Sequence, residues 1–566
     1  MAKLSELDRG PAPNLPFNSV WEALQHGYEL NPDKTALIAP TQPSDLLQEL
    51  VGPTASPVDH LTWSFRQIWR ATFRLASVFE AHHITSGSTV LLLVPSCAEW
   101  TVLMCPTAYK CYTMVPLNTV VLQKENEDRL QGFIERLTPS VVVVSNESEA
   151  AVVDRFRNKQ NSTFLGLTLD PLSEPLPGWT SIPVIAKLLF PKEIKAEPEL
   201  DNMERTAWII HTSGTWSDTP KAVPRPTRFL THAMLFEVPA IDEPLVLVNT
   251  KNHQMMAPWL FFVALRSGNT AVLAGGKDFD PTATLHALAT CRQRLTMLFP
   301  IMADLLVAHP DFSPDKVDSV MHATVLGSTT TEAVIRKTQQ AFPKAIIDPG
   351  YAMTEVNAAF RWPPPGPPTP IPTYKGIVST GIASPGFKFK IVDDSGQIVS
   401  RYAPGEVHIS GTYVTKGYLH GRPADTFYEE NGESWFRIGD CLVVDDQDQI
   451  YALGRMDDVI KRNGTIISPG TIQNLLATHY NTSVMVVKAI SSDGLELPFS
   501  VFAKLDQNPA DIEALVLKEL GPSYRLGGVL DRQQLGFEQW PVNGKLLVSE
   551  IRRAVAKYLA ANEAEA

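Results

Sequence analysis

Short runs of apolar, often β-branched residues alternate with amphipathic segments over much of the first 350 residues. Short apolar runs are typical of buried strands, and segments with apolar residues every three or four positions are typical of helices that cover a sheet. The alternation therefore predicts an α/β architecture with a parallel sheet. The predicted strands are Thr89–Val94, Ser140–Ser145, Ala207–His211, Leu245–Asn249, Thr270–Ala274, Thr296–Phe299 and Lys344–Ile347. The predicted helices include Lys124–Leu137, Pro281–Arg292 and Thr331–Phe342. The last of these helices opens on a TTTE sequence, which predicts a capping box.

The pattern changes near Pro363, where the sequence PPPGPPTPIP is incompatible with a helix or a central strand. After it, GEVHIS, GTYVTKGYL and DQIYALG predict short antiparallel strands joined by Gly and Asp turns, which indicates a β-rich subdomain over about residues 374–456. Residues 1–456 are thus expected to form one large domain, and residues 457–566 a small α+β lid domain. The elements predicted in the lid are Ser483–Ala489, Leu497–Leu505, Asp511–Leu520 and Leu547–Asn562.

Composition excludes several classes of protein. The chain has 566 residues, of which 44% are hydrophobic and 19% are charged, so it can bury large cores and is not intrinsically disordered. Its 49 Lys and Arg against 61 Asp and Glu leave a net charge of -12, which disfavours a general affinity for nucleic acid or anionic membrane. A polyanionic ligand must therefore meet a local positive site.

The sequence carries no signal for secretion, membrane insertion or disulfide formation. Its N-terminal residues lack an apolar core after a basic start. The most apolar stretch, Val90–Cys105, is interrupted by Pro95 and Glu99, which favours a buried strand and a core helix over a membrane span. The five cysteines are scattered without CxxC spacing. We therefore expect a cytoplasmic protein in a reducing compartment.

The segment Trp208–Pro224, WIIHTSGTWSDTPKAVP, has the form of a phosphate cradle. An apolar run leads into a loop rich in hydroxyl groups that ends at Pro220 and Lys221, so backbone N–H groups, hydroxyls and one ammonium can converge on phosphate oxygens. Neither a Walker A sequence nor GxSxG occurs in the chain. Taken alone, an ordinary polar loop is the commoner explanation. The candidate phosphate ligands are Thr212, Ser213, Gly214, Thr215 and Lys221.

Six motifs, in order, resemble those of the adenylate-forming superfamily, which comprises acyl- and aryl-CoA ligases, peptide-synthetase adenylation domains and luciferase-like enzymes. The phosphate loop TSGTWSDTPKAV resembles the family's TSGTTGxPKxV. The others are MVPLN (114–118), GYAMTE (350–355), FRIGD (436–440), GRMDDVIKRNGTIISP (454–469) and PVNGK (541–545), which resemble xVPL, YGxTE, YxTGD, GRxDDxIKxxGxxIxP and PxTxNGK. The resemblance spans most of the chain and implies attack of a carboxylate on the α-phosphorus of ATP, with loss of pyrophosphate.

The resemblance also implies roles for single residues. Because both reactants are anions, the protein must supply cations and aligned donors. Lys545 matches the lysine that bridges the substrate carboxylate and the α-phosphate, whereas a lone lysine after Asn-Gly is usually only solvated. Glu355 matches the magnesium-binding glutamate, since Mg²⁺ takes one or two carboxylates together with phosphate oxygens. The nucleotide contacts implied are Thr354 at the α-phosphate, Gly350 and Tyr351 at the adenine, Asp440 at the ribose hydroxyls, and Arg455 and Lys461 at the ribose and phosphates. Two of these residues have an ordinary structural alternative: Tyr351 as a core tyrosine and Asp440 as a turn residue.

Two further positions concern the transfer to a thiol. Asp457 matches the family's hinge, about which the lid pivots after adenylation so that the same site faces an acceptor. Gly464 matches the glycine beside the pantetheine tunnel in thioester-forming members, where a side chain would block the acceptor; a plain turn glycine is the alternative. The resemblance thus implies ATP and Mg²⁺ as cofactors and CoA as acceptor.

Several positions depart from the family pattern. The phosphate loop is one residue longer than the common form, and Asp218 in it would repel the β- and γ-phosphates unless it turned outward. Ala352 replaces a glycine, Ile438 replaces a threonine, and PGTIQ stands where the family has PxEIE. None of these changes affects Lys545, Glu355, Asp440 or Arg455, so we predict activity with an altered loop.

The segment Lys251–Phe262, KNHQMMAPWLFF, bears on the choice of acid. Amino-acid-activating relatives carry FDxS here, whose aspartate pairs with the substrate ammonium, but this segment has no carboxylate. His253 falls where CoA ligases often place a histidine. A substrate without an α-amine is therefore expected. The residues expected to shape a pocket for a flat aryl or medium-chain acyl group are His253, Trp259, Gly327, Ser328 and Ala358. Packing in an ordinary helix core explains the aromatic residues as well.

Three hypotheses follow. The leading one is an AMP-forming acid:CoA ligase, favoured because no carrier-protein sequence follows Lys545. The second is an enzyme, or an excised domain, that loads an acyl group onto the phosphopantetheine of a carrier protein. The third is a nucleotide-binding pseudoenzyme, inactive because of its altered phosphate loop.

Overall fold

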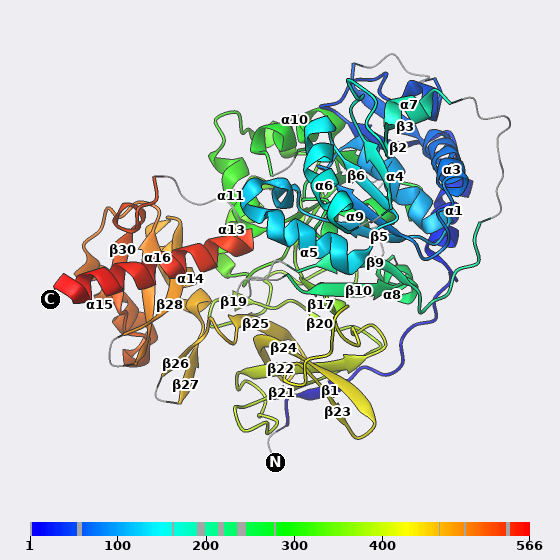
Figure 1. Ribbon diagram of the computed structural model, residues 1–566. Coiled ribbons are helices and arrows are strands. Elements are labelled where there is room, and N and C mark those ends of the chain that lie inside the picture. The colour runs from blue at the N-terminus through cyan, green and yellow to red at the C-terminus, as the bar shows by residue number, and fades with distance from the viewer. Residues whose placement is uncertain are drawn as a thin grey trace.

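The computed structural model (Figure 1) describes residues 3–53, 59–160, 163–188, 198–212, 220–234, 245–276, 279–462, 464–491, 494–538 and 544–565. Two seven-stranded sheets dominate the N-terminal part, and each is parallel except for one strand at its edge. The first sheet runs β10 (Ala222–Pro226), β9 (Thr206–His211), β5 (Thr113–Pro116), β4 (Thr89–Leu93), β6 (Val141–Val144), β7 (Leu165–Thr168) and β8 (Trp179–Ser181). The second runs β15 (Ile346–Pro349), β14 (His322–Val325), β13 (Leu295–Leu298), β11 (Leu245–Val248), β12 (Thr270–Leu273), β2 (Thr35–Ala39) and β3 (Leu61–Ser64).

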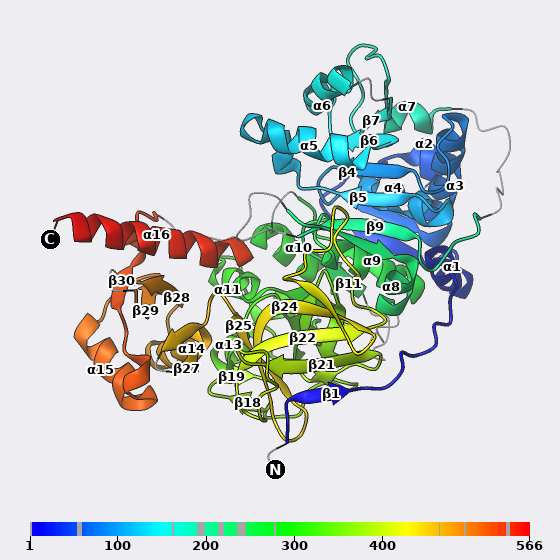
Figure 2. The ribbon, with the colours of Figure 1, turned by 60° about the horizontal axis from the view of Figure 1, so that its bottom comes forward.

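Helices separate the two sheets and cover their outer faces, as the turned view shows (Figure 2). The largest apolar core joins one face of each sheet through the helices between them, which are α1 (Val20–Leu30), α3 (Phe65–Ala81), α4 (Ala98–Tyr109), α8 (Thr227–Ala233) and α9 (Met256–Arg266). Helices α5 (Glu127–Leu137) and α6 (Glu147–Gln160) cover the other face of the first sheet, and α10 (Pro281–Cys291), α11 (Pro300–Ala308) and α13 (Glu332–Ala341) that of the second. Short helices occur at Gln48–Val51, Ile182–Ala186 and Pro314–Val317.

The most apolar stretch of the sequence forms a buried strand and a core helix, as predicted. Strand β4 is followed by α4, in which every residue is buried, Glu99 included. Gln42 accounts for that burial, because its side-chain amide donates to Glu99 Oε2 at 2.8 Å. A helix that is apolar on all sides belongs between two sheets. None of the described helices is long and apolar enough to span a membrane.

A six-stranded antiparallel sheet, called here the β-rich sheet, follows the Pro-rich segment. Its strands are β1 (Glu6–Asp8), β21 (Phe387–Val392), β22 (Gly405–Gly411), β24 (Glu433–Val444), β23 (Phe427–Glu430) and β25 (Ile450–Arg455). Three smaller strands, β16 (Tyr351–Met353), β17 (Asn357–Arg361) and β20 (Ile382–Ala383), connect it to the second sheet, and β18 (Thr373–Tyr374) pairs with β19 (Ile377–Val378).

The C-terminal segment, residues 457–566, has its own small sheet. Its elements are β26 (Ile460–Arg462), β27 (Thr465–Ile467), α14 (Pro469–Tyr480), β28 (Val484–Ile490), β29 (Glu496–Phe502), α15 (Pro509–Leu520), β30 (Gly528–Asp531) and α16 (Gly544–Glu565). Helix α14 contacts α13, where Asn474 Oδ1 accepts from the backbone N–H of Ala333 at 2.9 Å. The predicted fold class, two α/β subdomains and a β-rich subdomain followed by a small α+β segment, is confirmed.

Several local predictions were wrong. Strand β1 was missed, although it pairs with β21, because ELD has no strand signal of its own. The segment GTYVTKGYL forms no regular strand beyond Gly411. Strand β15 runs two residues further than predicted, through Pro349, which is tolerated because β15 lies at the sheet edge. The TTTE sequence forms no capping box, since the N-cap of α13 is its last threonine, Thr331, whose hydroxyl accepts from the N–H of Val334.

Candidate active site

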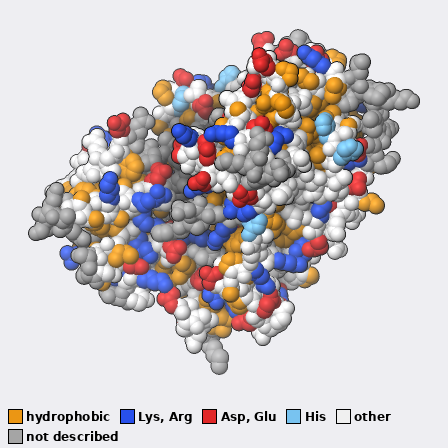
Figure 3. Space-filling model, in the orientation of Figure 1, with side chains coloured by type: hydrophobic (Ala, Val, Ile, Leu, Met, Phe, Trp, Pro, Cys, Tyr) orange, Lys and Arg blue, Asp and Glu red, His pale blue; other side chains and the backbone are white. Residues whose placement is uncertain are grey.

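One cavity of about 1720 Å³ lies where the carboxyl ends of the second sheet face the β-rich sheet and the C-terminal segment. The carboxyl edge of a parallel sheet is the usual place for a ligand in α/β proteins. On the face shown in Figure 3, Lys and Arg side chains gather along the junction between the C-terminal segment, at the left, and the rest of the molecule. The predicted site residues that line the cavity are Thr212, Lys221, His253, Trp259, Gly327, Ser328, Gly350, Tyr351, Thr354, Glu355, Ala358, Asp440, Arg455 and Asp457.

Asp440 lies at the centre of a three-residue contact in the cavity wall. It faces Arg455 across β24 and β25, and Arg455 Nη1 donates to Asp440 Oδ1 at 2.7 Å. The hydroxyl of Tyr351 donates to Asp440 Oδ2 at 2.5 Å. Burial and the adjacent Asp440 carboxylate raise the pKa of Tyr351, so its phenol is protonated at neutral pH. Burial opposes the charge of Arg455, but Asp440, Tyr351 and Glu355 together outweigh it and raise the pKa of the guanidinium.

Glu355 lies in the same wall and is 6% exposed. The hydroxyl of Tyr418 approaches Glu355 Oε1 at 3.4 Å, and the N–H of Thr415 donates to the Glu355 carbonyl at 2.9 Å. Lys221 Nζ lies 5.0 Å from the centre of the Tyr418 ring. The segment that was expected to be a strand, GTYVTKGYL, therefore supports the glutamate instead. Glu355 places one carboxylate in the cavity wall, which suits a cation that completes its shell with phosphate and water. Within the described residues no three His, Cys, Asp or Glu side chains form a metal cluster.

Arg225, in β10, is a residue that sequence reasoning missed. Its side chain is fully buried behind the cavity wall, and Nη1 donates to the carbonyl of Thr354. The guanidinium lies 4.6 Å from the centre of the Phe229 ring. Burial lowers its pKa to about 9, although the negative charge of Glu355 opposes that shift. A charged residue in the otherwise apolar run AVPRP was the only signal for it in the sequence.

Two histidines in the wall are uncharged at neutral pH. Burial, with Arg136 and His420 nearby, lowers the pKa of His211 to about 4. Burial, with Arg361 and Arg225 nearby, likewise lowers the pKa of His232 to about 4. The ring of His232 stacks on Tyr413 at a centroid distance of 3.5 Å. These imidazoles present neutral polar surface to the cavity.

The two ends of the predicted phosphate loop are held together at the cavity. Strands β9 and β10 are antiparallel, and the N–H of Thr212 donates to the carbonyl of Lys221 at 2.9 Å. Ser213, Gly214 and Thr215 lie outside the described residues, so their predicted contacts stay predictions.

Helix α16 reaches the cavity with its N-terminal end, and both ribbon views show its other end directed outward. Ser549 and Arg552 line the cavity, and Arg552 forms an ion pair with Asp458, beside the predicted hinge residue Asp457. Lys545 is the second residue of α16, and its side chain lies outside the described part of the chain. Because residues three and four positions apart share a helix face, position 545 lies on the face that carries Ser549 and Arg552.

Two predicted site residues lie away from the cavity in this arrangement. Lys461 Nζ forms an ion pair with Asp394 Oδ1 at 2.6 Å on the surface. Gly464, with φ +73°, follows β26 in an open turn, and a Cβ there would meet no atom within 4 Å. Their expected contacts with phosphate and thiol are therefore not formed in this orientation of the C-terminal segment.

The predicted substrate residues lie where the second sheet ends. Trp259 Nε1 donates to the carbonyl of Ala233 at 2.9 Å, which fixes the indole in the wall. Gly327 has φ +97°, and a Cβ there would lie 2.3 Å from Phe299 Cδ1, so only glycine allows the Phe299 ring to cover this turn. The apolar part of the lining, which sequence reasoning did not find, includes Met255, Met256, Met297, Phe299, Met302 and Leu326.

Comparison with known proteins bears on the whole chain. The family model described as AMP-binding enzyme matches residues 24–419. The chain belongs to this family. An acyl-CoA ligase of Pestalotiopsis microspora is 28% identical over 578 residues, which cover 98% of this chain and 99% of that relative. The prediction of an AMP-forming acid:CoA ligase that uses ATP and CoA is confirmed at the level of the enzyme class.

Solved structures support the fold. The anthranilate CoA ligase AuaEII, in complex with anthranoyl-AMP, matches with a TM-score of 0.79 at 19% identity, over 97% of this chain and 99% of its own. The O-succinylbenzoate CoA synthetase MenE of Bacillus subtilis, in complex with ATP and a magnesium ion, matches with a TM-score of 0.69 at 19% identity, over 94% of this chain and 98% of its own. At such identities the likeness concerns the fold alone.

Proposed function

We propose that the chain activates an aryl or medium-chain carboxylic acid without an α-amine as its acyl adenylate, and then transfers the acyl group to the thiol of CoA. One observation carries the proposal. Tyr351, Glu355, Asp440 and Arg455, which come from three separate motifs, line one cavity, and the first turns of α16, which holds Lys545, reach the same cavity.

In the first step a carboxylate oxygen attacks the α-phosphorus of ATP, and the bond to pyrophosphate breaks. Asp440 is suited to accept hydrogen bonds from the ribose hydroxyls, since it lines the cavity and its carboxylate is held there by Arg455 and Tyr351. Thr354 and Lys545 are assigned to the α-phosphate, where a hydroxyl and an ammonium offset the growing negative charge. Glu355 is the residue that would hold Mg²⁺, which when bound neutralises phosphate charge.

In the second step the CoA sulfur attacks the acyl carbonyl and AMP leaves. Since Gly464 and Lys461 lie away from the cavity here, we assign this step to a second orientation of the C-terminal segment, reached by a pivot at Asp457. Gly464 would then leave room for the pantetheine arm. The contact of Asn474 with α13 belongs to the first orientation.

The choice of acid is supported by the apolar lining. Met255, Met256, Met297 and Met302 are flexible side chains that adapt to a ligand's shape, and Phe299 offers a flat face. No acidic side chain follows His253 in the segment 251–262, so an α-ammonium would find no partner there. The cytoplasmic location expected from the sequence stays a prediction.

A panel of aryl, aryl-alkenoic and C4 to C12 acids, scored by pyrophosphate and AMP release with and without CoA, tests the proposal. We expect acid-dependent pyrophosphate release with ATP and Mg²⁺, and an acyl-CoA product when CoA is added. Acyl transfer to a phosphopantetheinyl carrier protein but not to CoA would favour the carrier-loading alternative. ATP binding without AMP production across the panel would contradict the proposal and favour a pseudoenzyme.

A further inference from the structure

A carboxylate lies in the wall of the cavity, in the part formed by the second sheet. Asp348 is in β15, Thr324 is its cross-strand neighbour in β14, and Met297 is the neighbour of Thr324 in β13. All three line the cavity. Cross-strand neighbours present their side chains on the same face of a sheet, so Asp348 is set into a wall that is otherwise formed by a methionine and a threonine.

The Asp348 carboxylate is poorly satisfied within the protein. Its side chain is 13% exposed, and its Oδ1 atom is buried with no hydrogen-bond partner among the residues that the structure describes. The Oδ2 atom lies 3.5 Å from Nε2 of His322, which has no hydrogen-bond partner in the same part of the chain. A buried carboxylate oxygen without a donor is costly, and such a group is expected to have a function or a missing partner.

The position of Asp348 relative to the reacting atoms limits what that partner is. Gly350 is two residues further along the chain, just past the end of β15, and Thr354 and Glu355 follow it, so the reaction centre lies beyond the carboxyl end of β15. Two strand residues correspond to about 6 to 7 Å. Because Gly350 has no side chain, the cavity stays open between the reaction centre and Asp348; a Cβ at Gly350 would already lie 3.0 Å from Thr324 Cγ2.

We propose that Asp348 is a specificity-determining residue, and that the acid activated by this chain carries a hydrogen-bond donor, a hydroxyl or an amino group, on the part of the molecule remote from its carboxylate. The proposal rests on the proposed function, since it takes the acyl group to occupy this cavity. The donor would bind the Asp348 carboxylate, whose side chain keeps 13% of its surface exposed. It would differ from an α-amine, which lies next to the reacting carboxylate.

Matched pairs of acids test this inference in the full-length protein. Benzoate, cinnamate, phenylacetate and hexanoate are compared with analogues that carry one hydroxyl or amino group at each ring position or at the ω carbon, by the kcat/KM of ATP-dependent AMP formation. At least one substituted acid is expected to exceed its unsubstituted parent by about 10- to 150-fold, the range for a hydrogen bond to a charged group. Asp348→Leu should abolish that preference by raising activity on the parent and lowering it on the substituted acid.

Asp318→Asn is the matched control, because Asp318 pairs with Arg292 and Lys344 at the surface, outside the cavity; it should keep the wild-type preference. Thermal unfolding separates a structural role, since removing a buried carboxylate whose only near neighbour among the described residues is His322 at 3.5 Å should leave the midpoint unchanged or raise it. A fall in midpoint with an equal loss of rate on both members of a pair would overturn the inference. Equal activity of the wild type on both members would overturn it while leaving the proposed function intact, and no activity on any acid would overturn both.

Discussion

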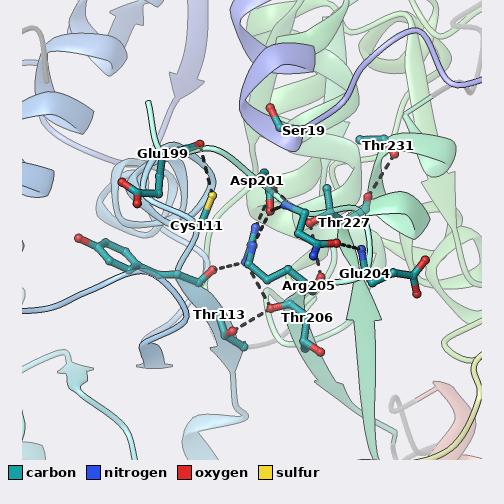
Figure 4. A network of polar contacts seen from close by, with 12 residues as sticks. Ser19, Cys111, Thr113, Glu199, Asp201, Glu204, Arg205, Thr206, Thr227 and Thr231 are labelled. Carbon is teal, nitrogen blue, oxygen red and sulfur yellow. Dashed lines mark hydrogen bonds and ion pairs between the residues drawn. The ribbon is translucent and has the colours of Figure 1, made fainter. Parts of the chain in front are cut away.

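Two Asp–Arg pairs with similar closest N–O distances occupy different regions of this molecule. Figure 4 shows Asp201 with Arg205, near the start of β9, where Arg205 Nε donates to Asp201 Oδ1 at 2.6 Å and Nη2 donates to Oδ2 at 2.9 Å. The second pair, Asp440 with Arg455, has a single direct bond of 2.7 Å. The Asp201 and Arg205 side chains are 0% and 13% exposed, whereas those of Asp440 and Arg455 are 15% and 47% exposed.

The two pairs differ most in what else they bind. Arg205 Nη1 also donates to the carbonyls of Tyr112 and Thr206, and the Thr227 hydroxyl donates to Asp201, so the first network is closed within the protein (Figure 4). Asp440 and Arg455 line the cavity and keep room for further partners. The same residue types therefore stabilise the fold where they are closed off and offer a binding site where they are open.

Breaking the Asp201–Arg205 pair, whose contacts are closed within the protein, should produce the largest loss of stability. Asp201→Ala leaves the guanidinium of Arg205 buried without its carboxylate, which is expected to cost about 3 to 5 kcal/mol of unfolding free energy. Urea denaturation followed by fluorescence measures this loss. Activity per folded molecule should stay within about twofold of wild type, because the pair does not contact the cavity. A variant of unchanged stability would show that the network is not structural.

Lowering the pH should reduce the free energy of unfolding, because the histidines in the cavity wall are uncharged in the folded protein. The folded-state pKa of His232 is about 4, below its ordinary value of 6.5, so its contribution to stability is present above pH 6.5 and is lost as the pH falls toward 4. The shift corresponds to roughly 3 kcal/mol. His232→Phe, which keeps a ring against Tyr413, should remove that part of the pH dependence in urea denaturation between pH 7 and 4. An unchanged slope would mean that His232 takes up protons equally in the folded and the unfolded protein.

Changing the Asp440–Arg455 pair, which lines the cavity, should affect nucleotide binding more than stability. Asp440→Asn weakens the contact with Arg455 and the proposed contact with the ribose hydroxyls, so kcat/KM for ATP in pyrophosphate exchange should fall about 30- to 100-fold, or about 2 to 3 kcal/mol. Its unfolding free energy should change by less than about 1 kcal/mol, since Arg455 is 47% exposed. A loss of stability equal to that of Asp201→Ala would remove the distinction between the two pairs.

Arg225 lies between these two cases, since it is buried as Arg205 is but contacts the site through Thr354. Arg225→Met fills the same space without charge, so stability should be unchanged or higher. The KM for magnesium-ATP should rise about 3- to 10-fold, because the Thr354 carbonyl loses its donor and Glu355 loses a neighbouring positive charge. Excess Mg²⁺ should partly restore the rate. Lower stability with an unchanged KM would assign Arg225 to folding alone.

Much of the candidate site could be predicted because its residues occur in short sequence motifs. Thr354, Glu355, Asp440 and Arg455 each occur in a sequence that fixes both the residue and its turn, and all four line the cavity. The layered sheets followed from the alternation of apolar runs and amphipathic segments. Both kinds of signal are local in the sequence, so no knowledge of distant contacts is needed.

The rest depends on contacts between distant segments. Strand β1 exists because the edge of β21 presents Lys388 and Lys390 opposite Asp8 and Glu6, and nothing in ELD shows it. Asp348 and Arg225 read in the sequence as single charges in apolar runs. Only the pairing of Asp348 with Thr324 in β14, and the hydrogen bond from Arg225 to the Thr354 carbonyl, show that one lines the cavity and the other supports its wall.

The most direct test of the account is Lys545→Ala assayed in the two half-reactions. Acid-dependent exchange of labelled pyrophosphate into ATP should fall by at least about 100-fold, because the ammonium that offsets charge at the α-phosphate is lost. Thioester formation from chemically prepared acyl-AMP and CoA should stay within a fewfold of wild type. Equal loss of both half-reactions, or normal pyrophosphate exchange, would contradict the proposal that this residue brings an acid and ATP together in the cavity.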